Sequence, residues 1–536
     1  MSGYLRRLAT TGAAYTAASI LSKLIAVALL PLYTRYLTPA DYGAAEVLFS
    51  AVVAASIVFR LGVIEAVLRF YYKAGEDPDR VISTSFAALF WAGAVACALV
   101  FPFAGPLSEA LLDRPDAGLV RVAVGGLWVL TMTEYMLTLF RLDERARAYF
   151  TVTIASVLAT IALTVVLVVG AEMGALGVLV GSYVTGGVIV CGLIVYQWRR
   201  LSLLVDRALL RRELRFGLPT MPAELSLYSL NFIDRIVIVR FVGLAEAGLY
   251  SLAVKFSQTV NVLVRGFQLA WPPLAYSVVD DDEARRFYAL VVTWFTAVCT
   301  FVVVAIWLLA RWVVRALAAP EYFAAYEAIG LISAGVTLYA LYMVLLVILG
   351  RTGRTEFNFP ATLAATVVNL ALNLLLVPSM GMVGAGLALV ISYVVVLVLM
   401  YVFTQRLFPV PYEWGRLARV VIIAALVIGV GDLVAPTEGV AGLAARLLFC
   451  CAYPALLLAS GFFTPAEREG LLLLGRPREL IARAAALRPR AAAGEAAPTA
   501  AAADGGAEAE AAAEAGPERG IPEVYEAELR DEDSRY

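Results

Sequence analysis

The sequence predicts an all-α polytopic membrane protein with about 14 transmembrane helices, arranged as two six-helix lobes related by a parallel repeat plus two additional C-terminal helices. Three observations predict this fold. First, 61% of the 536 residues are hydrophobic and only 16% are charged, whereas a soluble domain is about half apolar and about a quarter charged. Second, apolar stretches of about 20 residues, long enough to cross a bilayer as helices, recur along the chain. Third, the two halves of the chain share a pattern of charged and glycine residues.

The predicted spans lie at about 9–32, 44–64, 82–104, 118–140, 150–170, 174–197, 217–240, 246–270, 287–310, 325–349, 358–377, 381–404, 418–435 and 440–463. Accordingly, we expect an N-terminal lobe at 1–200 (spans 1–6), a C-terminal lobe at 201–410 (spans 7–12) and two additional spans at 411–464. Residues 465–536 mix Leu with Arg at first and then become rich in Ala, Glu and Gly. This composition predicts an amphipathic cytoplasmic segment followed by a disordered acidic tail.

Arginine and lysine are concentrated in the loops on one side of the predicted spans. The largest cluster follows span six and consists of Arg199, Arg200, Arg207, Arg211, Arg212 and Arg215. Loops on the other side carry few cations and several acids. Because cytoplasmic loops carry the excess of Lys and Arg, this asymmetry predicts that both termini are cytoplasmic.

The segment that joins spans one and two resembles the segment that joins spans seven and eight. The matching residues, at an offset of 205, are Arg35, Asp41 and Gly43 in the first copy and Arg240, Glu246 and Gly248 in the second. The same offset pairs Arg60 with Arg265. Farther on, Gly174-Ala175 and Ser182-Tyr183-Val184 match Gly384-Ala385 and Ser392-Tyr393-Val394 at an offset of 210. Six spans are an even number, so both copies enter the membrane from one side, and such parallel repeats build transporters with a path between their halves.

Composition excludes several kinds of chemistry. The chain contains no histidine, and its five cysteines lie in apolar stretches without a metal-binding spacing. These features, and the lack of a phosphate-binding glycine loop, predict no catalytic residue, no cofactor and no metal site.

Charged side chains inside predicted spans are costly in a bilayer, so they usually face protein or water. The cations at such positions are Lys23, Arg60, Arg235, Lys255 and Arg265, and the acids are Glu134, Glu224 and Asp234. We expect the cations to line a cavity and the acids to act in gating or ion pairing. Alternatives stay open: Arg60 and Arg265 lie close enough to the membrane surface to reach it, and Glu134 could carry a coupling proton or pair with a cation.

Two groups of motifs resemble a known family. Residues 31–43, Pro-Leu-Tyr-Thr-Arg-Tyr-Leu-Thr-Pro-Ala-Asp-Tyr-Gly, resemble the opening signature of the bacterial polysaccharide (O-antigen type) flippases. Residues 216–222, Asp234-Arg235, Gly248-Leu-Tyr-Ser and Lys255 resemble the second-half signature of that family. The likeness covers roughly residues 1–460. The family belongs to the superfamily of multidrug, oligosaccharidyl-lipid and polysaccharide exporters, whose members are carriers rather than enzymes.

The resemblance implies a flippase that moves an undecaprenyl-diphosphate-linked oligosaccharide from the cytoplasmic to the outer leaflet of the bacterial inner membrane, for O-antigen or exopolysaccharide biosynthesis. The expected partners are the lipid-linked oligosaccharide, membrane lipid, a coupling ion (proton or sodium) and polysaccharide polymerase or export machinery, with no nucleic acid. The cavity cations would bind the diphosphate. Two other functions compete with this one. A drug or cation exporter would need an acidic lobe, and a membrane enzyme would need a long outer loop with catalytic groups.

Overall fold

The computed structural model describes residues 29–465, except 74, 76 and 231, together with residues 21, 25 and 467. Most of the predicted first span, including Lys23, and nearly all of the predicted segment 465–536 lie outside the described residues. Contacts divide the chain into two units, residues 1–463 and 464–536, and all the helices named below belong to the first. Regular structure in the described part of the chain is entirely helical, which confirms the predicted all-α class.

The helices of the first half form what we call the first lobe. They are α2 (Leu30–Tyr36), α3 (Pro39–Arg60), α4 (Val63–Phe70), α5 (Pro78–Val100), α6 (Ala104–Leu112), α7 (Ala117–Leu142), α8 (Ala146–Val165) and α9 (Gly174–Gln197). Short segments extend three of them: η1 (Phe101–Phe103), the π-helical turn η2 (Val166–Gly170) and η3 (Trp198–Arg200).

A connector and the second lobe follow. The connector is α10 (Arg207–Gly217) with the turn η4 (Leu218–Thr220). The second lobe consists of α11 (Met221–Ser229), α12 (Ile233–Phe241), α13 (Leu244–Ser257), α14 (Val260–Ser277), α15 (Asp281–Leu317), η5 (Pro320–Ala325), α16 (Tyr326–Arg351), η6 (Thr355–Phe357) and α17 (Asn358–Leu407). The last two helices are α18 (Trp414–Val434) and α19 (Gly439–Ala459).

Ten helices in the described part are long and apolar enough to cross a membrane, so the chain is a multi-pass membrane protein, but the predicted count of 14 is not confirmed. Span one lies mostly outside the described residues. The chain is interrupted near residue 230 in predicted span seven and near residue 258 in span eight, so the pieces are too short to count. Spans eleven and twelve are joined as α17, whose 50 residues would reach about 75 Å if straight. Gly381, with φ 55° and ψ −136°, separates them.

Several helices begin where a polar side chain can accept from the first free backbone N–H groups, as expected for N-caps. Thr38 caps α3 by accepting from the N–H of Asp41, and Pro39 follows it at the first helical position. Asp77 caps α5, Asp116 caps α7 and Asp280 caps α15 in the same way. These local signals fix where the spans start and therefore which residues face the junction between the lobes.

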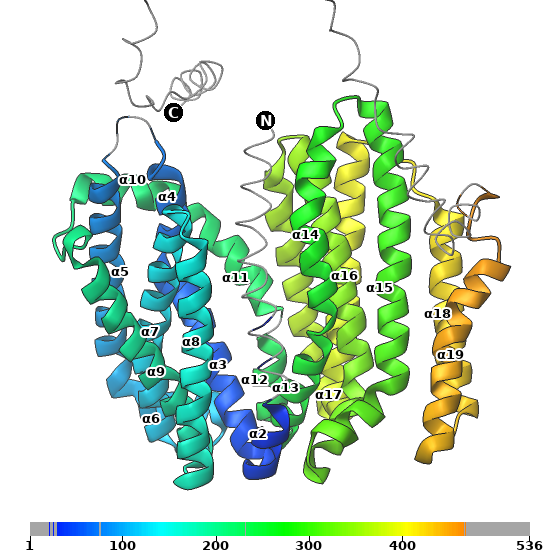
Figure 1. Cartoon of the computed structure of the whole chain (residues 1–536), viewed down its shortest axis with the longest axis horizontal. Coiled ribbons are helices and arrows are strands. Elements are labelled where there is room, and N and C mark those ends of the chain that lie inside the picture. The colour runs from blue at the N-terminus through cyan, green and yellow to red at the C-terminus, as the bar shows by residue number, and fades with distance from the viewer. Residues whose placement is uncertain are drawn as a thin grey trace, which may run out of the picture. The chain divides into compact units, whose positions relative to one another are not determined.

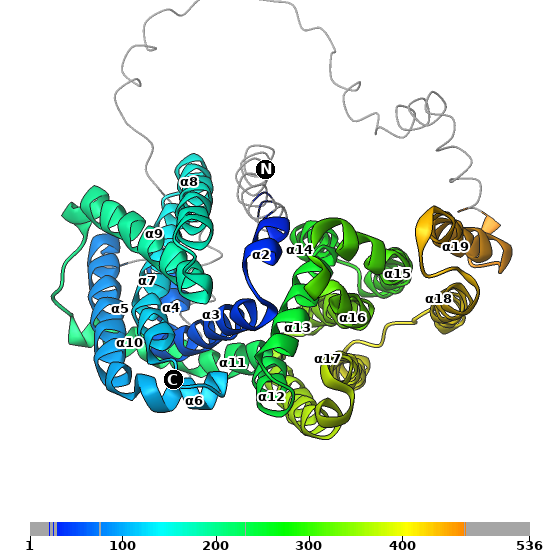
Figure 2. The same cartoon turned by 90° about the horizontal axis from the view of Figure 1, so that it is seen from below.

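The two lobes meet along α3 and α13, which pack against each other in the middle of the bundle (Figures 1 and 2). Within each lobe the longer helices stack side by side around these two. The connector helix α10 packs on α4 and α5 of the first lobe, although it follows the predicted lobe boundary at residue 200. We call the end of the bundle at which α3 and α13 begin the glycine end, and the opposite end, with α4 and α10, the basic end.

The additional helices α18 and α19 pack on each other and on α15. A small apolar cluster that includes Val304, Leu308 and Tyr453 fills this contact. Near it, the buried guanidinium of Arg446 pairs with Asp432 at 2.8 Å, and Asp432 also accepts from the indole N–H of Trp307 at 2.9 Å. Helices α18 and α19 are therefore attached to the second lobe through one helix, α15.

Candidate functional site

Gly43 and Gly248, which match in the repeat, meet where the lobes meet. A Cβ built on Gly43 would lie 2.1 Å from the carbonyl oxygen of Leu244 and 2.8 Å from the nitrogen of Gly248. A Cβ on Gly248 would lie 2.0 Å from the carbonyl oxygen of Pro39. Only glycine allows the backbones of α3 and α13 to come this close. The repeat found in the sequence is therefore expressed as a close contact between the two lobes.

Other contacts join the lobes at the glycine end. Arg240 of α12 donates to Asp113, which follows α6, at 2.5 Å. The hydroxyl of Tyr322 donates to the carbonyl oxygen of Leu37 at 3.0 Å, and the N–H of Ala319 donates to the hydroxyl of Thr34 at 3.2 Å. The lobes are thus held together at this end in the structure.

The acids of the repeat loops, Asp41 and Glu246, each lie beside a turn that contains a glycine with positive φ. Glu246 accepts from the N–H of Met382 at 3.1 Å, next to Gly381 with φ 55°. Asp41 lies beside Gly174, which has φ 54°. Gly174 and Gly381 thus occupy similar turns beside the acids of the two repeat loops, and the match of Gly174 with Gly384 stays a prediction.

Tyr183 and Tyr393 keep the predicted match. Tyr183 lies against Gly126 of α7, and Tyr393 lies near Gly335 of α16. Arg35 is exposed and has no polar partner among the residues that the structure describes.

Arg60, at the last position of α3, is held by two carboxylates. It donates to Glu134 of α7 at 2.5 Å and to Glu224 of α11 at 2.8 Å. The Arg60 side chain is only 12% exposed, whereas those of Glu134 and Glu224 are 36% and 43% exposed. The guanidinium thus links a helix of the first lobe to a helix of the second, and its carboxylate partners are accessible.

The chain turns sharply at Leu61 and Gly62, directly after Arg60, and this corner packs against the connector. Leu61 and Gly62 have φ 52° and 68°, which ends α3 and starts α4 in a new direction. A Cβ on Gly62 would lie 2.1 Å from the carbonyl oxygen of Gly217 at the end of α10. The segment from Gly217 to Glu224 therefore contacts this corner at both of its ends. Pro219 and Pro222 lie within it, as expected for an interrupted helix.

Lys255 of α13 forms a further ion pair between the lobes, with Glu46 of α3 at 2.5 Å. The Glu46 side chain is 13% exposed and that of Lys255 is 30% exposed. The Lys255 ammonium also lies 5.0 Å from the centre of the Tyr42 ring, a favourable distance for a cation–π contact. Two cations predicted as cavity residues are therefore both paired with carboxylates across or beside the lobe junction.

Arg265 differs from its repeat partner Arg60. It lies within α14 rather than at a helix end, because α14 continues to Ser277. It is exposed and forms no hydrogen bond or ion pair with any residue in the described ranges. Of the two repeat-related arginines, one is bound by carboxylates and the other is free.

Asp234 lies at the centre of a buried polar cluster. The predicted single span seven is two helices here, so Glu224 and Asp234 lie on α11 and α12. Asp234 is fully buried and accepts from the Tyr250 hydroxyl at 2.6 Å and from the Asn373 amide at 2.8 Å. The neighbouring Arg235 is 8% exposed and donates to the hydroxyl of Ser251 at 3.1 Å. Asp234 thus has neutral hydrogen-bond partners on α13 and α17.

This cluster has unused hydrogen-bonding capacity. The side-chain oxygen of Asn373 and the side-chain nitrogen of Asn369 are buried without a partner. Both residues are themselves fully buried on α17, one helical turn apart. Buried polar groups are normally satisfied, so orphan atoms beside a carboxylate call for an explanation.

Sequence reasoning missed Glu46, Asn369 and Asn373. Glu46 was detectable, because it is a carboxylate inside an apolar span like the acids that were selected. The two asparagines are neutral and carry no signal beyond their spacing of four residues. Lys23 lies outside the described residues. Among the described residues, no group of three or more His, Cys, Asp or Glu could hold a metal ion.

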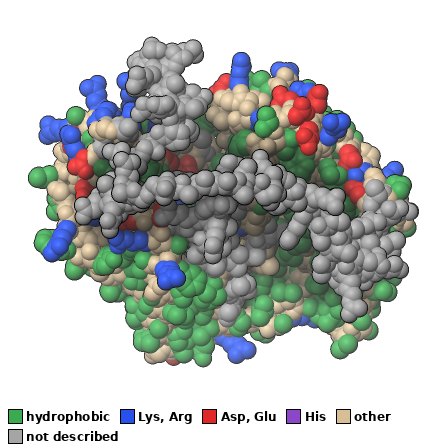
Figure 3. Space-filling model, turned by 45° about the horizontal axis from the view of Figure 1, so that its top comes forward, with side chains coloured by type: hydrophobic (Ala, Val, Ile, Leu, Met, Phe, Trp, Pro, Cys, Tyr) green, Lys and Arg blue, Asp and Glu red, His purple; other side chains and the backbone are tan. Residues whose placement is uncertain are grey.

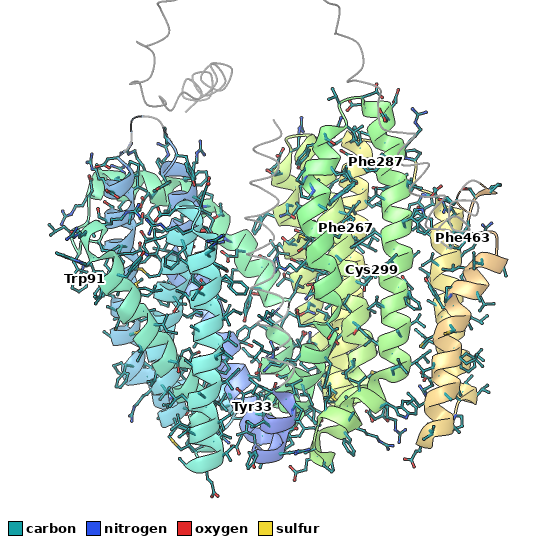
Figure 4. All side chains as sticks on the ribbon, viewed as in Figure 1. Tyr33, Trp91, Phe267, Phe287, Cys299 and Phe463 are labelled. Carbon is teal, nitrogen blue, oxygen red and sulfur yellow. The ribbon has the colours of Figure 1, made fainter. Side chains whose placement is uncertain are left out.

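Taken together, the charged groups can bind anions and can change partners. Arg60 and Lys255 would attract a phosphate group if their carboxylates moved away, and Arg265 has no polar partner among the described residues. Glu46, which is largely buried, would then need a new partner, such as a cation or a proton, whereas the more exposed Glu134 and Glu224 could be hydrated. Figure 4 shows the side chains that fill the lobes around these helices.

Comparisons with known proteins agree on a class of membrane carriers. A family profile described as "Polysaccharide biosynthesis protein" matches residues 8–275. The succinoglycan biosynthesis transport protein ExoT of Rhizobium meliloti (strain 1021) is 26% identical over 313 residues, which are 57% of this chain. The chain spans about 61% of the length of that relative.

Solved structures share the fold. The lipid II flippase MurJ, in an inward closed conformation, superposes with a TM-score of 0.67 at 12% identity, over 83% of this chain and 99% of that one. An inward-facing multidrug resistance transporter of the MATE family, from the MOP superfamily, superposes with a TM-score of 0.61 at 17% identity, over 75% and 96% of the two chains.

Proposed function

This chain belongs to the polysaccharide biosynthesis protein family, and from that premise we propose that it is a flippase for an undecaprenyl-diphosphate-linked oligosaccharide. It would move this lipid from the cytoplasmic to the outer leaflet of the bacterial inner membrane by alternating access. The observation that carries the proposal is the position of Arg60 and Lys255 at the junction of the two lobes, each paired with a carboxylate. The relatives are transporters and flippases, not enzymes.

The substrate headgroup matches these cations. A diphosphate carries concentrated negative charge with several acceptor oxygens, and Arg binds such groups through a planar fork of donors. In the proposed cycle, the diphosphate displaces the Glu224 carboxylate from the Arg60 guanidinium. Arg265, which has no polar partner among the described residues, supplies a second guanidinium. The polyprenyl chain stays in the bilayer beside the lobes.

Replacement of Glu224 by the diphosphate would also loosen the lobes. Glu224 lies on α11, the helix that follows the connector, and its contact with Arg60 ties α11 to α3. Two contacts hold the connector segment to the corner after α3, the Gly62–Gly217 packing and the Arg60–Glu224 ion pair. Once the ion pair is released, only the glycine packing remains of these two. Loss of such ties at one end, with the glycine end closed, is what alternating access requires.

The buried cluster around Asp234 supports a coupling ion. A buried carboxylate whose hydrogen-bond donors are neutral, with an unused amide oxygen nearby, offers oxygen ligands of the kind that small cations prefer. Interrupted helices commonly hold such ions in transporters. The break between α11 and α12 lies directly before Asp234. We propose sodium or a proton as the ion, bound at Asp234 with Asn369 and Asn373.

The orientation and partners follow from the same proposal. The basic end, which carries Arg199 to Arg215, would face the cytoplasm with both termini. The lobes would comprise residues 1–200 and 201–410, followed by the additional helices at 411–464. A polysaccharide polymerase or export machinery would receive the product in the outer leaflet.

The test is the distribution of the lipid-linked oligosaccharide in cells that lack this protein. Accumulation on the cytoplasmic face, reversed when the protein is restored, supports the proposal and identifies the sugar by mass. The alternative is an exporter of drugs or cations, which the MATE-like fold also fits. Normal leaflet distribution together with increased sensitivity to cationic drugs would favour that exporter.

A further inference from the structure

The connector and the loop before it form a surface that the proposed transport cycle does not use. The loop at residues 201–206 and helix α10 lie at the basic end, over α4 and α5. Lys and Arg side chains gather on the first-lobe side of this end, above flanks that are mainly hydrophobic (Figure 3). We call the exposed residues Arg199, Leu203, Leu204, Arg207, Arg211 and Arg215 the α10 platform.

The loop of the platform is held firmly by internal contacts. Arg200 donates to Asp79 at 2.9 Å and to Asp143 at 2.8 Å. Arg80 of α5 pairs with Asp206. The indole N–H of Trp91 donates to the carbonyl oxygen of Leu203 at 3.2 Å, and Trp91 lies on the outer flank of the first lobe (Figure 4). The platform is therefore a fixed surface rather than a loose loop.

These contacts occupy the acidic groups of the region. Asp79, Asp143 and Asp206 are engaged by the arginines just named. Asp206 also caps α10, and the N–H of Leu209 followed by the Arg80 guanidinium lowers the pKa of Asp206, which keeps it ionised and bound. Glu213 is fully buried and accepts from the Ser85 hydroxyl at 2.7 Å. These four acids of the platform region are thus engaged by polar partners.

The arginines of the platform, by contrast, are exposed. Arg199, Arg207, Arg211 and Arg215 form no hydrogen bond or ion pair with any residue in the part of the chain described here. Three of them follow one another at intervals of four along α10 and therefore share one face of the helix. Like charges at this spacing repel each other and destabilise a helix. A row of guanidinium groups without polar partners among the described residues is consequently complementary to a ligand with negative charge.

Apolar side chains identify the kind of anion. Leu203 is 49% exposed and Leu204 is 82% exposed, directly before the arginine row. Trp198 is 65% exposed beside Arg199, whose guanidinium lies 5.7 Å from the indole ring. Free arginines next to exposed leucine and tryptophan match a ligand with an anionic head and an apolar chain. A soluble phosphate or a nucleic acid would not use the leucines.

We propose that the α10 platform binds anionic phospholipid, with the headgroup on Arg207, Arg211 and Arg215 and the acyl chains beside Leu203 and Leu204. This site is separate from Arg60 and Lys255 and does not depend on what the protein transports. Because α10 continues through η4 into α11, a lipid bound here would also fix the start of the segment that carries Glu224.

The test is native mass spectrometry of the purified full chain, titrated with phosphatidylglycerol or with phosphatidylcholine of the same acyl chains. The wild type should bind phosphatidylglycerol more tightly. The triple variant Arg207→Gln/Arg211→Gln/Arg215→Gln should lose about a hundredfold in phosphatidylglycerol affinity while phosphatidylcholine binding stays the same. Its melting temperature should not fall, because the replaced side chains have no polar partners among the described residues and their mutual repulsion is removed.

The matched control is Arg286→Gln/Arg354→Gln/Arg406→Gln. These arginines are also exposed and without a polar partner among the described residues, and they lie in the second lobe. The control variant has the same net charge as the test variant and should bind phosphatidylglycerol like the wild type. Equal losses in both triple variants, or no loss in the test variant, would overturn the proposal. Unchanged lipid binding combined with capture of an acidic protein by the platform would assign it to a protein partner instead.

Discussion

Gly43 and Gly248, which are 205 residues apart, pack backbone against backbone, so that a Cβ on Gly43 would come within 2.8 Å of the Gly248 nitrogen. Their helices belong to different lobes, and the contact lies at the end where Arg240–Asp113 and Tyr322–Leu37 also join the lobes. The closed glycine end thus depends on two residues without side chains.

Gly43→Ala or Gly248→Ala should lower stability by about 1–3 kcal/mol, because the added methyl group must push α3 and α13 apart. Thermal unfolding of the purified protein would measure the change. Gly125→Ala and Gly192→Ala are the controls, since a Cβ at either position meets nothing within 4 Å. If the test variants melt like the controls, the close packing of the lobes is not what the structure indicates.

Arg60→Gln and Arg265→Gln should have different effects on stability but the same effect on transport. Arg60→Gln removes the partner of Glu134 and Glu224 and should lower the melting temperature. Arg265, by contrast, has no polar partner to lose within the described ranges. Both changes should slow transport by roughly ten- to a hundredfold. This factor corresponds to the loss of one hydrogen bond to a charged group, which contributes about 1.5–3 kcal/mol. A flipping assay in vesicles, with protein levels checked, measures this effect.

Arg35→Gln serves as the control for both variants, because Arg35 is exposed at the glycine end and should affect neither measurement. Normal transport by Arg60→Gln and Arg265→Gln would remove both residues from the proposed diphosphate site. The family assignment would be unaffected by that result.

Lys255→Met should destabilise the protein by about 1–3 kcal/mol, because Glu46 is largely buried and would lose its partner. Glu46→Gln combined with Lys255→Met should recover much of this loss, since neither charge then remains unpaired. Melting curves of the two single variants and the double variant form a double-mutant cycle. Additive losses in the double variant would show that the two side chains do not interact.

Asp234→Asn should remove the effect of the coupling ion on stability. A ligand that binds only the folded state at 100 times its Kd stabilises it by about 2.7 kcal/mol. We therefore expect the wild type to melt at a higher temperature in sodium than in potassium, or to depend on pH if the ion is a proton, and the variant to show neither dependence. Asp113→Asn, which changes an exposed carboxylate, is the control. The cluster is not the ion site if Asp234→Asn retains the wild-type ion dependence.

The sequence predicted the all-helical membrane class well, because length and apolar composition of the spans are local properties. The repeat was also visible, since Gly43 and Gly248 are fixed by a contact that allows no side chain. Interruptions of the helices were not predicted: the αL corner at Leu61 and Gly62 and the break before Asp234 lie inside continuous apolar stretches. Such breaks are decided by tertiary packing, which hydropathy does not report.

The candidate site was predicted only as a set of isolated charges. Arg60 and Glu224 are 164 residues apart, and Lys255 and Glu46 are 209 residues apart. Nothing in one sequence states which acid meets which cation over such distances. Asn369 and Asn373 were missed for a different reason. A neutral amide raises the cost of inserting a helix into the membrane less than a charge does, so it does not by itself indicate a functional residue.

The ion pair between Glu46 and Lys255 also breaks the symmetry of the repeat. At the offset of 205, the counterpart of Glu46 is Ser251 and the counterpart of Lys255 is Ser50. In a dimer of identical units the same contact would occur twice, once on each side of the axis. Here one pair of positions forms an ion pair, whereas the two counterpart positions carry hydroxyl side chains and form none. The contact between the lobes is therefore nearly symmetric in its backbone but not in its charges. A headgroup bound there would contact different side chains on its two sides, and so it would have a preferred orientation about the membrane normal.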